Sequence, residues 1–215
     1  VTGDVHLILA DGASVTTGNI EVADGNALTL YAQSAGPDQG SLQAQSDDPA
    51  AAIGGSSQAP QSSGAITING GTVTAITTGS GAAISGSSVT IQGGTVTAQS
   101  NGSCDIYGTF STGTNGSARI YADTISDTSA QSSWSCLWVQ KDAATVYGSI
   151  ILTDDMTLDR PLTVYANGQL TVNGTLTCQK GLVNNGILTN NGTVLVAGGD
   201  LDNRGTLAIA ATGTL

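Results

Sequence analysis

Apolar and polar residues alternate in short stretches along most of the chain, and glycine or asparagine separates one stretch from the next. Residues 66–75 read ITINGGTVTA, in which Ile66, Ile68 and Val73 alternate with polar neighbours. A period of two is typical of a strand with one buried face. The pattern therefore predicts many short strands joined by tight corners. Gly70 and Gly71 mark one such corner, because glycine accepts a positive φ.

The same phrase returns at residues 89–98, which read VTIQGGTVTA and match at eight of ten positions with an offset of 23. This offset is too long for a hairpin, but it fits one coil of a parallel β-solenoid, in which neighbouring coils stack about 4.8 Å apart. We therefore expect Ile68 to lie over Ile91, with both side chains inward, and Val73 to lie over Val96.

Weaker repeats extend this pattern. Residues 52–54 (AIG) correspond to residues 83–85 (AIS) at an offset of 31. The additional length coincides with residues 56–63, SSQAPQSS, which are predicted to form a loop inserted into one coil. Residues 105–108 and 145–148 both end in Tyr-Gly. This similarity predicts that the two segments form the same corner in two different coils.

In the last third of the chain glycine recurs at short intervals, and each of these glycines is followed closely by an aliphatic residue. We call one such interval a beat. Three beats make a coil of about 18 to 20 residues. Two aliphatic columns are then expected, with Leu170, Leu188 and Leu207 in one and Leu176, Val194 and Leu215 in the other. The asparagines between the beats predict left-handed corners and side-chain ladders along the stack. They are Asn167, Asn173, Asn184, Asn185, Asn190, Asn191 and Asn203.

Composition excludes helical folds. Gly, Ser and Thr supply 81 of 215 residues, whereas Glu, Lys, Arg and Met together supply seven, so no polar helix face can be written. A hydrophobic content of 39% argues against disorder. We predict an all-β chain that forms one β-helix domain over residues 1–215, a single-stranded solenoid of about ten coils.

The net charge limits the possible binding partners, and the chain ends indicate the kind of protein to which this sequence belongs. The net charge of −11 excludes nucleic acid as a partner and disfavours anionic membrane surfaces. No apolar run approaches about 18 residues, so we expect no membrane insertion. The chain begins at Val1 and ends at Leu215 in mid-pattern, from which we expect a segment of a longer secreted or surface-attached protein.

The amino-acid sequences of the repeats resemble those of a known group of proteins. The phrases GAITINGGTVTA, AAIGG, GAAISG, LTLYAQS and LTVYANGQLTVNGTL, which lie between residues 28 and 215, resemble the β-helical repeat regions of cell-surface proteins of Gram-positive gut bacteria. Those regions are often described as carbohydrate-binding or cell-wall-anchored. The resemblance implies a right-handed parallel β-helix of the pectate-lyase-like class, located outside the cell, at its surface or in its wall. The expected partners of this monomer are glycans or surface proteins of a host or neighbouring cell.

Parallel β-helices also host polysaccharide-cleaving enzymes, which need carboxylates about 5 to 9.5 Å apart, one with a raised pKa. The best candidates are Asp154, Asp155 and Asp159 in TDDMTLDRP. Against catalysis, His6 is the only histidine, and no carboxylate lies in a stretch that looks buried. We therefore expect no enzyme and no catalytic residue, and keep a polysaccharide hydrolase or lyase at these aspartates as the alternative.

Aromatic residues make up 4% of the chain, so their grouping is informative. Trp134 and Trp138 flank Cys136, and in one strand all three would face the same way. Burial is the preferred interpretation. The alternative is a carbohydrate-binding module, in which the tryptophans stack on sugars. They would extend a ligand-binding strip with three tyrosines, Tyr107, Tyr121 and Tyr147.

The cysteines Cys104, Cys136 and Cys178 lie far apart in the sequence and form no CxxC pair, so we expect no metal site. Buried free thiols are the preferred interpretation, and one disulfide is the alternative. Calcium-loop signatures and cofactor motifs are absent, so no cofactor is expected. Together these observations predict a non-catalytic β-helical segment of a bacterial cell-surface or secreted protein that acts as a stalk or adhesin toward glycans or proteins.

Overall fold

A computed structural model describes residues 1–47, 49–55, 63–102, 104–114 and 116–215. They form two compact units. The N-terminal unit comprises Val1–Gly113 and Arg119–Ala130, and the C-terminal unit comprises Thr114–Ala118 and Gln131–Leu215. Among the described residues there is no α-helix, and one 3-10 turn, η2, covers Gln131–Ser133. The chain is therefore all-β, and the expected lack of helix is confirmed for this part of it.

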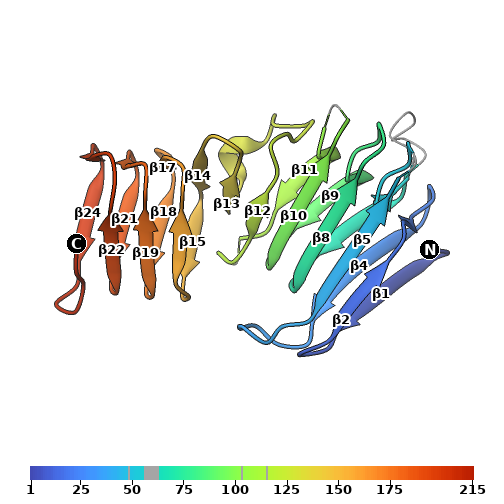
Figure 1. Ribbon diagram of the computed structural model, residues 1–215, viewed down its shortest axis with the longest axis horizontal. Coiled ribbons are helices and arrows are strands. Elements are labelled where there is room, and N and C mark those ends of the chain that lie inside the picture. Colours follow the sequence, from blue (N-terminus) through green and yellow to red (C-terminus); the bar gives the residue numbers. More distant parts are fainter. Residues whose placement is uncertain (48, 56–62, 103, 115) are drawn as a thin grey trace. The chain divides into compact units, whose positions relative to one another are not determined.

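The N-terminal unit contains two sheets of parallel strands among its described residues (Figure 1). The first has the order β1-β4-β7-β9-β6-β3, and β11 also pairs with β9. Its strands are β1 (Asp4–Leu9), β3 (Ile20–Glu21), β4 (Ala27–Ala32), β6 (Ile53–Gly54), β7 (Ala65–Ile68), β9 (Ile84–Ile91) and β11 (Ile106–Thr112). The second has the order β2-β5-β8-β10-β12. Its strands are β2 (Ser14–Thr17), β5 (Ser41–Ser46), β8 (Thr72–Thr77), β10 (Thr95–Ser100) and β12 (Arg119–Tyr121).

The strand register in this unit follows the sequence repeat. Ile68 pairs with Ile91, and Val73 pairs with Val96, in parallel ladders. All four side chains are fully buried, so the predicted stacking is confirmed. Ile53 pairs with Ile84, as the weaker repeat predicted. These pairings show that each segment returns to lie beside its own repeat.

Glycine forms the corners between these strands. Gly71 and Gly94 have φ values of 89° and 83°, which L side chains rarely adopt. A Cβ atom on Gly94 would lie 3.0 Å from the Cα atom of Gly70 in the neighbouring repeat. Glycine is therefore required at this corner both by its backbone angle and by the close approach of the next layer.

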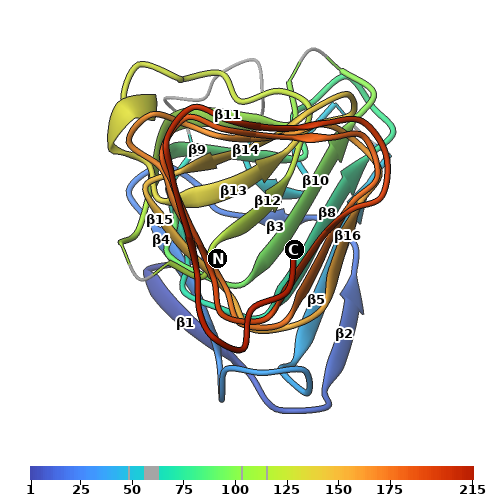
Figure 2. The ribbon, with the colours of Figure 1, turned by 90° about the vertical axis from the view of Figure 1, so that its left-hand side faces the viewer.

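The C-terminal unit repeats a shorter path (Figure 1). Three ladders run through it, with the orders β13-β14-β17-β20-β23, β15-β18-β21-β24 and β16-β19-β22. Their strands are β13 (Cys136–Val139), β14 (Ala144–Tyr147), β15 (Ser149–Leu152), β16 (Met156–Leu158), β17 (Leu162–Val164), β18 (Gln169–Val172), β19 (Thr175–Cys178), β20 (Leu182–Asn184), β21 (Ile187–Asn190), β22 (Thr193–Val196), β23 (Leu201–Asn203) and β24 (Thr206–Ile209). Figure 2 shows successive turns of this unit, orange to red, following nearly the same path.

The predicted aliphatic columns are present. Leu170 pairs with Leu188, and Leu188 with Leu207. In the second column Leu176 pairs with Val194, and a parallel bridge from Thr193 to Thr214 continues the same register. The glycine beat therefore predicted the length of a turn in this unit correctly.

One hairpin interrupts the parallel pattern. β13 and β14 pair in the antiparallel sense, with Cys136 opposite Tyr147, whereas β14, β17, β20 and β23 pair in the parallel sense. The predicted equivalence of residues 105–108 and 145–148 is therefore wrong. The first segment enters β11, which pairs parallel with β9, and the second ends the hairpin strand β14.

The asparagines form ladders but not left-handed corners. Asn184 Nδ2 donates to Asn203 Oδ1 at 2.7 Å, and Asn191 Nδ2 donates to Asn173 Oδ1 at 2.9 Å. No described residue other than glycine has a positive φ, so the predicted left-handed asparagines are wrong. Glycine takes these angles because it has no Cβ to clash with the following carbonyl.

The predicted inserted loop, residues 56–63, lies outside the described residues except for its last member. Ser63 is fully buried and forms an antiparallel bridge with Ala23. This residue therefore belongs to the packed body of the N-terminal unit.

Candidate functional site

The aromatic side chains of the C-terminal unit gather at the β13–β14 hairpin. Trp134 packs edge-on against Trp138 and Tyr147, with ring centroids 5.7 Å and 5.8 Å apart. Trp134 and Trp138 are only 1% and 7% exposed. Edge-to-face packing at this separation is favourable for aromatic rings. The preferred interpretation of burial is therefore confirmed.

The hairpin explains why these rings are inside. All four residues of β13 are buried, so both faces of this strand are covered, in contrast to the alternating burial of the parallel strands. β13 begins at Cys136, and Trp134 precedes it. Trp134 therefore lies outside the strand that holds Cys136 and Trp138, because its backbone N–H closes the η2 turn by donating to the carbonyl of Gln131.

The five predicted strip residues come from several elements. Tyr147 packs with the tryptophans, whereas Tyr107 on β11 and Tyr121 on β12 belong to different sheets of the N-terminal unit. Sequence reasoning missed Tyr165, whose ring centroid lies 5.2 Å from that of Tyr147 and whose side chain is 46% exposed. A tyrosine directly after a short strand of the repeat was the signal that could have revealed it.

The three candidate aspartates lie at two corners of the C-terminal unit. Asp154 and Asp155 connect β15 to β16, and Asp159 follows β16. Asp155 Oδ1 accepts the backbone N–H of Thr175 at 2.8 Å, in the next turn of the chain. This bond satisfies the first amide of β19, so the carboxylate has a clear structural role.

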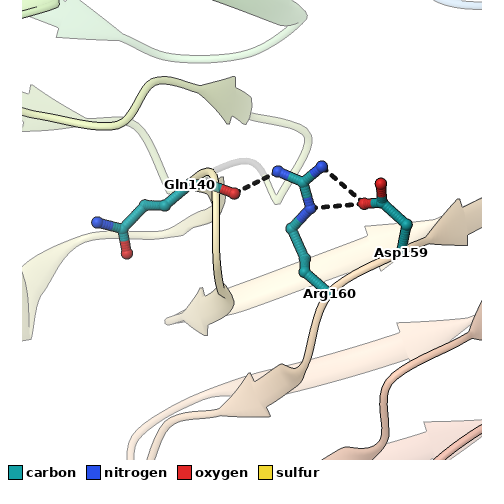
Figure 3. A network of polar contacts seen from close by, with 3 residues as sticks. All are labelled: Gln140, Asp159 and Arg160. Atoms are coloured by element: carbon teal, nitrogen blue, oxygen red, sulfur yellow. Dashed lines mark hydrogen bonds and ion pairs between the residues drawn. The ribbon is translucent and has the colours of Figure 1, made fainter.

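Asp159 and Arg160 form a polar network with the hairpin turn (Figure 3). Arg160 donates from Nε and Nη2 to Asp159 Oδ1 at 2.8 Å and 2.6 Å, and its Nη1 donates to the carbonyl oxygen of Gln140. Hydrogen bonds and charge from Arg160 lower the pKa of Asp159. A general acid needs the opposite shift, and the Asp159 side chain is 67% exposed. The network ties two turns of the C-terminal unit together.

A buried carboxylate lies elsewhere, contrary to expectation. Asp105 is 6% exposed, and its carboxylate accepts backbone N–H groups of Ser100, Asp123 and Thr124 at 2.7 to 2.9 Å. Three such donors replace the water that burial removes. Sequence reasoning missed Asp105 because its neighbourhood, NGSCDIYG, looks like an exposed corner. Its partners show a residue that holds corners in place.

The cysteines are all free thiols. Cys136 and Cys178 are buried, and Cys104 is half-buried. Burial raises the pKa of Cys136 to about 12 and that of Cys178 to about 11. Both thiols are therefore neutral and unreactive near neutral pH. The preferred interpretation is confirmed for these two residues, and the disulfide alternative is not present.

The described residues contain no group of three or more His, Cys, Asp or Glu side chains placed to hold a metal ion. They also contain no helix with the length and apolar character that crossing a bilayer requires. No family model matches the chain, and neither does any curated protein or solved structure. The assignment of function therefore rests on the geometry described above.

Proposed function

We propose that the chain is a right-handed parallel β-helix of about ten coils and a non-catalytic stalk or adhesive segment of an extracellular bacterial surface protein. The observation that carries this proposal is the register, in which similar phrases stack on one another strand by strand. Such stacking gives surface rows of side chains that repeat from one turn of the chain to the next. The resemblance to β-helical repeats of Gram-positive gut bacteria favours the same assignment.

The arrangement of the carboxylates supports a non-catalytic role. Asp155 is bonded to a strand amide, and Asp159 is paired with Arg160, which lowers its pKa. The buried carboxylate of Asp105 is occupied by three backbone donors. A polysaccharide hydrolase at these residues has no observation in its favour. Burial of Trp134 and Trp138 likewise weakens a module that binds sugars through them.

The two buried thiols, Cys136 and Cys178, are compatible with an extracellular setting. Oxidation and disulfide exchange proceed through the thiolate, and burial keeps Cys136 and Cys178 protonated. These two thiols can therefore persist in an oxidising compartment without forming disulfides.

Release of reducing or unsaturated ends from plant and host polysaccharides tests the proposal. We expect no release by the native chain, and Asp155→Asn and Asp159→Asn should behave identically. Release that is abolished in either variant, with its fold intact by circular dichroism, contradicts the proposal and favours the hydrolase or lyase.

A further inference from the structure

An exposed aromatic pair lies on the outer face of the first sheet of the N-terminal unit. The rings of His6 on β1 and Tyr31 on β4 have centroids 5.8 Å apart and planes inclined by 13°. His6 is exposed and Tyr31 is half-buried. Ile8 pairs with Tyr31 in the ladder and is 64% exposed. Unlike the Trp134 cluster, these three side chains are accessible to a ligand.

A row of hydroxyl groups extends from this pair across the sheet. His6 pairs with Thr29, and the same position continues through Thr67, Thr90 and Ser111 on β7, β9 and β11. These residues are half-buried or exposed, whereas their neighbours Leu28, Ile66 and Val89 are buried. The row therefore presents one hydroxyl per strand, about 4.8 Å from the next.

A second row, parallel to the hydroxyl row, continues from Tyr31 onto the next two strands and carries amide side chains. Asn69 extends β7 beside Tyr31 through a 2.8 Å bond from its backbone N–H to Leu30, and Gln92 extends β9 through a 2.7 Å bond to Ile68. Asn69 is half-buried and Gln92 is exposed. On the paired positions of β1, β4, β7 and β9, the outer face holds one acidic side chain, Asp4, one histidine, His6, and no lysine or arginine. The face thus has few acidic or basic side chains and is rich in hydrogen-bonding groups.

We propose that this face binds a neutral polysaccharide chain laid across the strands, with the apolar face of a sugar ring on Tyr31 and His6 and sugar hydroxyls along the Thr29–Thr67–Thr90 row. The proposal rests on the adhesive function proposed above and names its surface and ligand class. Sugars combine a C–H face that stacks on aromatic rings with many hydroxyls, which matches the two kinds of row. The net charge of −11 disfavours a polyanionic glycan. A protein partner would require a larger apolar centre than Ile8 and Tyr31 provide.

Native affinity electrophoresis of the full chain tests the site, with gels that contain hydroxyethyl cellulose, laminarin or galactomannan, and polygalacturonate as the anionic polymer. We expect at least one neutral polymer to retard the native chain and polygalacturonate to have no effect. Tyr31→Ala should weaken retardation about tenfold, as expected for loss of a stacking contact. Tyr31→Phe should retain it, because the ring remains. Tyr165→Ala is the matched control, because it removes an exposed tyrosine from the C-terminal unit.

Three results overturn the site: no retardation by any neutral polymer, equal weakening by Tyr31→Ala and Tyr165→Ala, or retardation by polygalacturonate that Tyr31→Ala leaves unchanged. Circular dichroism and thermal midpoints verify that each variant is folded. Reducing ends are measured on the same samples. Their release contradicts the non-catalytic function, whereas lack of retardation without release rejects the glycan face alone.

Discussion

Asn184 illustrates how a polar residue is accommodated in an aliphatic interior. It is fully buried, donates to Asn203 Oδ1 and to the carbonyl of Thr206 at 2.7 Å and 2.8 Å, and accepts the N–H of Gly186 at 3.2 Å. Its amide thus meets backbone groups of its own corner and of the next turn. A buried polar side chain is tolerated when its hydrogen-bonding groups are satisfied.

Asn184→Ala should lower the free energy of unfolding by about 2 to 4 kcal/mol, because it leaves buried backbone groups without partners. Asn191→Ala is the matched control. It removes an exposed ladder bond to Asn173 and should cost about 1 kcal/mol or less. Urea denaturation of the two variants measures the difference. Equal losses of unfolding free energy in the two variants would show that the buried asparagine stabilises the chain no more than the exposed one.

The tryptophans give a second test of packing. We expect blue-shifted fluorescence that iodide quenches poorly, and Trp134→Ala should cost about 3 to 5 kcal/mol of stability, because the ring is fully buried between Trp138 and Tyr147. Tyr165→Ala, at the exposed edge of the cluster, should cost markedly less. Emission near that of free tryptophan in the folded chain would contradict the packing.

The buried thiols predict a loss of stability in alkali. Their ordinary pKa of 9.0 rises to about 12 for Cys136 and about 11 for Cys178 on folding. Above pH 9 the unfolded chain releases thiol protons that the folded chain retains, so stability falls as pH rises. The contribution is intact below pH 9 and disappears progressively toward pH 11 to 12.

Between pH 8 and pH 10.5 each thiol should reduce the free energy of unfolding by about 2 kcal/mol. Urea midpoints at both pH values measure this loss. The double variant Cys136→Ala and Cys178→Ala removes the thiol contribution. It also removes the part of the raised pKa of Tyr147 that comes from Cys136, so the difference from the native chain measures the thiols together with this coupling. If native chain and double variant lose stability equally, the buried thiols are not responsible.

At the scale of elements, repeated phrases were sufficient to predict register. The repeated GGTVTA phrase placed Ile68 beside Ile91, and the glycine beat placed Leu170 beside Leu188, because a slip by one position would turn the apolar face outward. The hairpin had no such signal. Residues 131–144 match no repeat, and the Tyr-Gly match of residues 145–148 to residues 105–108 was misleading. Local alternation cannot distinguish parallel from antiparallel pairing. The buried role of Asp105 was equally hidden, because its backbone partners at Asp123 and Thr124 are distant in the sequence.

Glycine corners provide the corresponding element-scale prediction. Gly12 and Gly94 both have a positive φ, of 70° and 83°, but a Cβ would meet nothing within 4 Å at Gly12 and would crowd Gly70 at Gly94. Gly12→Ala should therefore cost about 1 to 2 kcal/mol from the backbone alone. Gly94→Ala should cost more, because the neighbouring layer must also move. Thermal midpoints compare the two, and equal costs would show that close approach contributes nothing.

At the scale of the whole molecule, each unit has terminal strands and strands paired on both sides. β8 pairs with β5 and β10, and β20 pairs with β17 and β23. β1 and β24 occupy the ends of their ladders, and their residues are largely exposed. Protection against hydrogen exchange follows burial and pairing.

Hydrogen exchange followed by mass spectrometry should therefore find amides of β8 and β20 at least about tenfold slower than those of β1 and β24. This comparison is made within each unit, so each contains its own control. Uniform protection from terminal to central strands would indicate that each unit opens only as a whole.

The parallel ladders of the C-terminal unit also determine how it responds to mechanical load. The hydrogen bonds that join β17, β20 and β23 point along the direction in which the turns of the chain stack. A tension applied in that direction loads the few bonds of one interface at a time rather than shearing a whole strand. Such a unit yields turn by turn, and each step releases the chain between two paired positions, such as Leu170 and Leu188. Under pulling it would lengthen in small increments and dissipate energy, as a shock absorber does.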